Sequence, residues 1–153
     1  MYPDENFIRG TVFLLYAGRV DRDHKPAVLH PIEVSLHPSL SGDRDGRIIA
    51  MLHDTFEDGL LTLAALPHGL GIDTDGRVAL SLIALTHNYH GTETYGEYIQ
   101  RIKNDAMERR DLIAARVKLA DLEVNMRRPG GSPSLLKRYI QAHEDLTKFI
   151  NFF

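Results

Sequence analysis

The sequence predicts an all-α domain, folded as one compact helical bundle. Apolar residues recur at helical spacing in several stretches, for example at Tyr95, Tyr98, Ile99 and Ile102. No run alternates apolar and polar residues long enough to build a sheet, and no internal repeat is present. The chain has 153 residues, so we expect one domain, 1–153, that is long enough to bury a core.

The composition limits the partners and the kinds of metal site that the protein can have. Hydrophobic residues make up 43% and charged residues 25% of the chain, as in ordinary globular proteins. A net charge of -3 gives no electrostatic case for a nucleic-acid or membrane partner. No apolar run approaches the ~20 residues of a membrane span and no signal peptide is evident, so we expect a cytoplasmic protein. Without cysteine, any metal must be held by His, Asp or Glu.

The expected helices follow from apolar clusters and from Pro, Gly and capping residues. A charged loop, 19–26, follows the first helix, and Pro38 ends the second. Thr74 or Asp75 would cap the helix over 78–85, and Ser134 the last helix. We expect helices at 7–17, at 31–37, from 41–43 through His53 to Asp58, at 78–85, at 94–102, at 111–126 as the longest strong helix, and at 134–149 after a Pro/Gly loop at 129–133.

An acidic cluster follows a strongly apolar segment. If 51–58 is helical, His53/Glu57 and Asp54/Asp58 are i,i+4 pairs at one end of one helix. Three carboxylates and an imidazole resist desolvation together unless a cation compensates them. The alternatives are a solvated, acidic helix end and a metal site with a spare acid or base.

Other polar residues leave similar alternatives. His30, beside Pro31 near a helix start, is either a cap or surface residue or a ligand. Asp121 lies inside an apolar helix, where an unpaired carboxylate is costly. It either forms a salt bridge with Lys118 or Arg128 or binds a metal. The two histidines of the loop at 87–91 are more typical of a solvated loop than of a ligand pair.

His30, His53-Asp54 and Asp121 form an H…HD…D set, which suits one divalent cation with positions left for water and substrate. The set resembles that of the HD superfamily of metal-dependent phosphohydrolases, and most closely the RelA/SpoT-type alarmone hydrolases and their small single-domain relatives. The resemblance extends from Gly18 to about Tyr139. The matching segments are 25–34, 52–58 (Leu-His-Asp-Thr-Phe-Glu-Asp), 94–102 and 117–126, which contains Lys-Leu-Ala-Asp.

The resemblance implies an HD-domain bundle and a role for each matching residue. It implies one metal ion, Mn²⁺ in the first place with Zn²⁺, Fe²⁺ or Mg²⁺ as alternatives, and a nucleotide-like phosphate or pyrophosphate ester as substrate. Guanosine 3′-diphosphate alarmones are one candidate. The alternative is a nucleotide-binding or regulatory module that has lost turnover. The implied residues are His30, His53, Asp54 and Asp121 for the metal, Glu57 and Asp58 for the attacking water, Asn125 for the substrate, and Lys118 for the phosphate or as a brace for Asp121.

The chain also departs from the resemblance in and before the 19–26 loop. Relatives usually carry a histidine where Tyr16 stands, a basic pair where Asp21 and Arg22 stand, and Pro-Tyr where Pro26-Ala27 stands. The basic residues left to contact a phosphate are Arg19, Arg22 and Lys25. A carboxylate beside a polyanion is repulsive. We therefore expect weaker alarmone hydrolysis than in those relatives, unless Asp21 pairs with Arg19 or Arg22.

Overall fold

Most of the long helices begin at residues that satisfy free backbone amides. The Asp4 carboxylate caps the first helix. Thr94 and Glu97 form a reciprocal capping box, in which each side chain accepts from the other residue's backbone amide. Ser132 caps the last helix, and Pro133 occupies its first turn, where no amide is needed.

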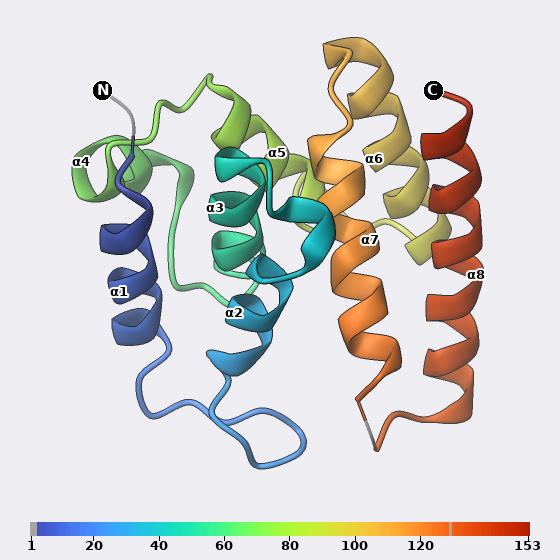
Figure 1. Ribbon diagram of the computed structural model, residues 1–153, viewed down its shortest axis with the longest axis horizontal. Coiled ribbons are helices and arrows are strands. Elements are labelled where there is room, and N and C mark those ends of the chain that lie inside the picture. Colours follow the sequence, from blue (N-terminus) through green and yellow to red (C-terminus); the bar gives the residue numbers. More distant parts are fainter. Residues whose placement is uncertain (1–2, 129) are drawn as a thin grey trace.

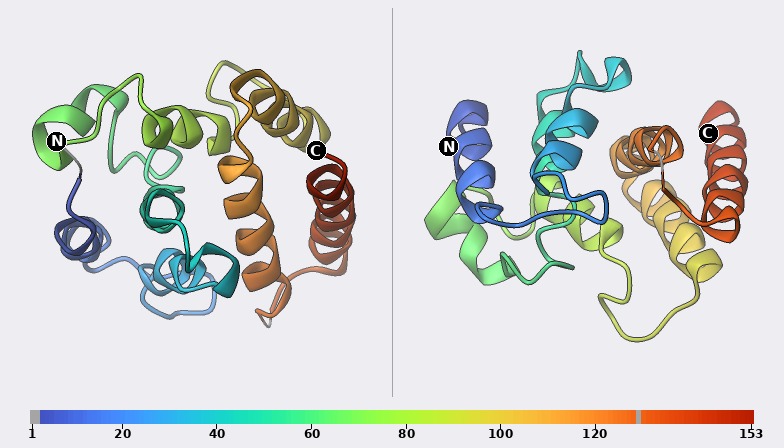
Figure 2. Two further views of the ribbon diagram at one scale, coloured as in Figure 1. Left: turned by 45° about the horizontal axis from the view of Figure 1, so that its top comes forward. Right: turned by 90° about the horizontal axis from the view of Figure 1, so that it is seen from below.

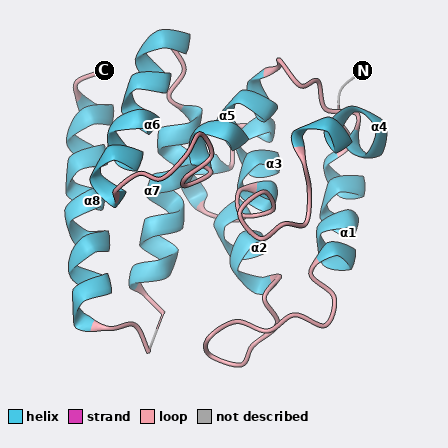
Figure 3. Ribbon diagram, turned by 180° about the vertical axis from the view of Figure 1, so that it is seen from behind, coloured by secondary structure: helices cyan, strands magenta, loops and turns pink. Residues whose placement is uncertain are grey.

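The structure is a computed structural model that describes residues 3–128 and 130–153 (Figure 1). Within these ranges it contains helices and loops and no strand, which confirms the all-α class (Figure 3). None of the helices in these ranges has both the length and the apolar composition to cross a membrane. The elements are α1 (Glu5–Leu15), α2 (Leu29–Ser35), the 3₁₀ turn η1 (Pro38–Leu40), α3 (Arg44–Leu52), η2 (Leu63–Ala65), α4 (Leu66–Leu70), α5 (Arg77–Leu85), α6 (Tyr95–Arg109), α7 (Ile113–Met126) and α8 (Pro133–Asn151).

Helix α7 is the central element. It packs against α2, α3, α5, α6 and α8, whereas α1 lies on the outer side of α3 and α8 covers α6 and α7 from the other side (Figures 1 and 2). Most residues of α7 are buried, including Lys118 and Asp121. A helix buried on nearly all sides needs a partner for every polar side chain it carries. The contiguous hydrophobic core extends from Ile8 in α1 to Leu146 in α8.

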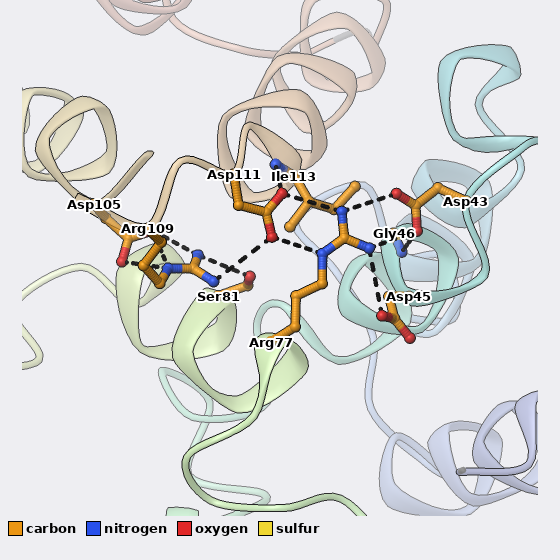
Figure 4. Close-up of polar contacts among 9 residues, drawn as sticks. All are labelled: Asp43, Asp45, Gly46, Arg77, Ser81, Asp105, Arg109, Asp111 and Ile113. Carbon is orange, nitrogen blue, oxygen red and sulfur yellow. Dashed lines mark hydrogen bonds and ion pairs between the residues drawn. The ribbon is translucent and has the colours of Figure 1, made fainter. Parts of the chain in front are cut away.

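Arg77, the first residue of α5, joins the starts of three helices (Figure 4). Its Nε donates to Asp111 Oδ2 at 2.6 Å, in the turn before α7. Its Nη1 donates to Asp43 Oδ1 at 3.1 Å, and Asp43 also caps α3. Asp45 lies 3.4 Å from the same Nη1. These contacts fix α3, α5 and α7 relative to one another at the end of the bundle where all three begin.

Several predicted helix boundaries were wrong. Gly76, not Thr74 or Asp75, precedes α5, and Ser132 rather than Ser134 caps α8. Helix α4 was not predicted, because its five residues carry too short an apolar pattern. Helix α8, with 19 residues, is longer than α7, with 14.

Three other predicted segments also differ from the structure. The first helix spans 5–15 rather than 7–17, and the second ends at Ser35. Helix α6 continues to Arg109, because buried Ala106 extends its apolar face beyond the predicted end at 102. The loop predicted at 129–133 joins α7 to α8, and its first residue, Pro129, lies outside the described residues.

Candidate metal and phosphate site

The acidic cluster is a turn, so the prediction of a continuous helix through 51–58 was wrong. Helix α3 ends at Leu52 with His53 as its C-cap. Thr55 Oγ1 donates to the Leu52 carbonyl at 2.7 Å, and the amide of Leu60 returns to the Thr55 carbonyl. Gly59 adopts φ 69°, a left-handed conformation that favours glycine. The acidic side chains therefore leave this segment in different directions.

His53 presents one ring nitrogen to two carboxylates. Its Nδ1 lies 2.6 Å from the Ala50 carbonyl, and this contact fixes the hydrogen on Nδ1. Its Nε2 lies 3.2 Å from Asp54 Oδ2 and 3.3 Å from Asp121 Oδ1. His53 is only 3% exposed, and its Nε2 has no hydrogen-bond partner among the described residues. A buried ring nitrogen that faces two carboxylates needs a positive charge beside them, either a proton on that nitrogen or a metal ion.

His30 and Asp121 complete the cluster from α2 and α7. His30 Nε2 lies 2.8 Å from Asp121 Oδ1, although the two residues are 91 positions apart. Ligand atoms of His30, His53 and Asp54 all lie within 4.8 Å of one another, a spacing that one metal ion can bridge. Asp121 is not part of that group of three, but it contacts both imidazoles. The structure thus brings together the four residues that the sequence suggested as ligands.

Asp121 is braced from its own helix. Lys118 Nζ donates to Asp121 Oδ2 at 2.9 Å, and Asn125 Nδ2 donates to Asp121 Oδ1 at 3.1 Å. Lys118 is 9% exposed, and its ammonium also lies 5.2 Å from the Tyr98 ring centroid. The sequence suggested Lys118 or Arg128 as the salt-bridge partner of Asp121, and the structure shows the salt bridge with Lys118. Arg128 contacts Asp21 instead.

Charge pairing outweighs desolvation in this cluster. Burial by itself raises the pKa of Asp121, but Lys118 and His53 hold that pKa well below the ordinary range. Burial lowers the pKa of the His53 imidazole, but Asp54 and Asp121 raise it well above its usual value. A protonated His53 and a divalent cation would satisfy the same carboxylates, so metal binding requires release of that proton.

Glu57 and Asp58 are held by different partners. Glu57 Oε1 accepts a 2.6 Å hydrogen bond from the backbone amide of His87. Asp58 Oδ2 accepts a 2.9 Å hydrogen bond from the Tyr16 hydroxyl. Burial raises the pKa of both carboxyls despite these bonds. Each is therefore a better proton acceptor than an exposed carboxylate.

Two hollows flank the His/Asp cluster, and His30, Asp54 and Arg128 line both of them. We call the first, of about 400 Å³, the first-loop hollow; its other lining residues include Tyr16, Arg19, Asp21 and Asp58. We call the second, of about 280 Å³, the tyrosine hollow; its other lining residues include Glu57, His87, Tyr95, Tyr98 and Tyr139.

The three basic residues of the 19–26 loop do not gather at the site. Arg19 lines the first-loop hollow. The Arg22 guanidinium lies instead beside Gly131, and Lys25 is exposed and lines neither hollow. Asp21 pairs with Arg128 at 2.5 Å, and not with Arg19 or Arg22 as the sequence suggested.

No protein-family model matches the chain. No curated protein sequence matches it either.

The structure adds residues to the site that the sequence did not single out for it. The His87 ring stacks on Tyr98 with centroids 4.9 Å apart, and Tyr98 donates to the Leu85 carbonyl at 2.6 Å. Arg101 bonds to the Thr86 carbonyl at 2.8 Å and thereby anchors the loop that presents the His87 amide. The i,i+3 spacing of Tyr95 and Tyr98 was visible in the sequence, but it indicated only a core-facing helix.

Proposed function

We propose that this protein is a metal-dependent phosphohydrolase that acts on a nucleotide-like phosphate or pyrophosphate ester. The observation that carries the proposal is the buried His53 Nε2, which faces Asp54 and Asp121 and has no hydrogen-bond partner in the part of the chain that the structure describes. Together with His30 these residues offer two nitrogen and two oxygen donors, which suit Mn²⁺, Fe²⁺ or Zn²⁺. When bound, such an ion polarises a phosphoryl oxygen and lowers the pKa of water.

The residues around the cluster have separable tasks. Lys118 is buried against Asp121 and orients that carboxylate, and it also lines the tyrosine hollow. Asn125 supports the same oxygen atom that faces the imidazoles. Glu57 or Asp58 accepts the proton of the attacking water, each on its own side of the cluster. Tyr95, Tyr98 and Tyr139 give the tyrosine hollow aromatic groups that suit a base or sugar.

The test combines metal analysis with turnover. Purified full-length protein should contain about one Mn²⁺, Fe²⁺ or Zn²⁺ per chain and release phosphate from members of a nucleotide panel when Mn²⁺ is added. His53→Ala and Asp54→Ala should lose both properties and keep their helical circular dichroism. His68→Ala removes an exposed imidazole on α4 and should change neither property. Metal binding without phosphate release from any nucleotide would instead favour the nucleotide-binding module.

A further inference from the structure

Arg128 occupies a distinctive place at the proposed site. Among the lysines and arginines of the described residues, it is the one that lines both hollows, together with His30 and Asp54. It follows the end of α7, and its amide donates to the Asn125 carbonyl at 3.2 Å. Its guanidinium side chain is 21% exposed, so an incoming ligand can reach it. A planar guanidinium binds carboxylate and phosphate oxygens with the same fork of donors.

A carboxylate already contacts that guanidinium. Arg128 Nη2 lies 2.5 Å from Asp21 Oδ2 and 3.7 Å from Asp23 Oδ2. Asp21 Oδ1 accepts from the amides of Asp23 and Lys25, at 2.8 and 3.0 Å. These two bonds fix the loop and leave Oδ2 directed at Arg128. Oδ1 of Asp21 therefore stabilises the loop, whereas Oδ2 binds the guanidinium that could otherwise bind an anionic ligand.

We infer that Arg128 recognises the phosphate group of the substrate and that Asp21 competes with that phosphate for it. This inference rests on the proposed function for its substrate class, but not for the contact itself. A phosphate entering either hollow meets the guanidinium next to His30 and Asp54 and displaces Asp21 from it. The Asp21 carboxylate then returns to solvent at the loop surface. The anionic competitor lowers affinity for every phosphate, and its removal frees Arg128.

The variants follow from the two oxygens of Asp21. Asp21→Asn keeps Oδ1 as the acceptor for the Asp23 and Lys25 amides and replaces the charged oxygen that faces Arg128. Arg128→Gln removes the guanidinium, and Arg128→Lys keeps its charge without the planar fork. Arg116→Gln, an exposed arginine of α7 that lines neither hollow, is the matched control. Circular dichroism and thermal unfolding establish that each variant is folded.

The probe is inorganic phosphate, titrated by calorimetry into the full chain at fixed ionic strength, with Mn²⁺ and after chelation. We expect Arg128→Gln to weaken binding about tenfold or more, since hydrogen bonds to charged groups are the strong ones. Arg128→Lys should keep part of the phosphate affinity that Arg128→Gln loses. Arg116→Gln should bind phosphate as tightly as the unmodified protein does. Asp21→Asn should tighten binding by about three- to fivefold, the range of a partly exposed ion pair.

The double variant decides whether Asp21 acts through Arg128. In the Arg128→Gln background, Asp21→Asn should give no gain. A gain that persists there reflects general charge repulsion and overturns the inference. Phosphate binding that needs Mn²⁺ but ignores Arg128 also overturns it, while leaving the proposed function intact. Conversely, Arg128-dependent binding by a chain that shows no metal-dependent turnover keeps the inference and removes the proposed function.

Discussion

The Tyr16 hydroxyl donates a hydrogen bond of 2.9 Å to Asp58, a residue 42 positions away in the sequence. Tyr16 is the C-cap of α1, whereas Asp58 lies in the turn after α3. The bond therefore ties the end of α1 to the edge of the candidate site. It also gives the Tyr16 side chain a role at the edge of the site.

Removing that hydroxyl should change the pH dependence of turnover. Burial raises the pKa of Asp58, and the hydrogen bond from Tyr16 opposes that increase. In Tyr16→Phe the pKa of Asp58 should rise further, because the ionised carboxylate loses a hydrogen bond that stabilises it. If Asp58 accepts the proton, the acid limb of the kcat/KM profile moves to higher pH. Tyr89→Phe is the control, and an unmoved limb excludes Asp58 as the base.

Glu57→Gln and Asp58→Asn should distinguish the two candidate bases. The variant that removes the proton acceptor should keep its metal and lose turnover by roughly 10²–10⁴-fold, the usual contribution of a general base. The other should lose much less. Metal content by mass spectrometry and phosphate release would be measured on the same preparations. Loss of metal together with turnover would make the residue a ligand or a support for one.

Arg101→Met should affect turnover without touching the metal ligands. Arg101 bonds to the carbonyls of Ala84 and Thr86 and to Glu93, and so holds the loop that carries the His87 amide to Glu57. We expect unfolding free energy to fall by about 1–3 kcal/mol, since carbonyls lose their donor. Turnover should fall with metal content unchanged. Lys137→Met, at an exposed position of α8, is the control. An unchanged kcat in Arg101→Met would show that the position of this loop does not affect catalysis.

Arg77→Gln should lower stability in a pH-dependent way. Arg77 lowers the pKa of Asp111, mainly through their hydrogen bond. In Asp43, burial raises the pKa, but the Gly46 amide and Arg77 lower it below its usual value. These carboxylates stabilise the fold fully above their unfolded pKa of 3.8 and lose that contribution as the pH falls through their folded values.

We therefore expect Arg77→Gln to cost about 1–2 kcal/mol at pH 7, allowing for solvent screening, and much less at pH 3. Urea unfolding between pH 3 and pH 7 measures this difference. Arg9→Gln removes the longer ion pair with Glu5, whose atoms lie 3.8 Å apart, and should cost little at either pH. A deficit in Arg77→Gln that stays constant from pH 7 to pH 3 would contradict the linkage.

The sequence by itself determined the class of fold and the residue types of the site. Helical spacing of apolar residues is a local property, so it predicted the segments that became α5, α6 and α7. An apolar cluster closed by Gly18 predicted α1. The cost of an unpaired carboxylate in an apolar helix made Asp121 a candidate before its neighbours were known. Absence of cysteine limited a metal site to histidine and carboxylate ligands.

Only the tertiary structure decided how these residues are used. The turn after Leu52 depends on Thr55 and Gly59, and it sends Glu57 and Asp58 to different hollows. The sequence of 51–58 fits a helix as well as a turn. Its second half is acidic, so it has no apolar stripe that would distinguish a helix from a turn.

Pairing across the bundle was also beyond the sequence. Asp21 and Arg128 are 107 positions apart, and either could have paired with a neighbour in its own segment. Their contact exists because α7 ends beside the loop that follows α1, an arrangement set by the packing of α7 among five other helices. Local patterns fix which side chains are available, and packing of the whole core decides which of them meet.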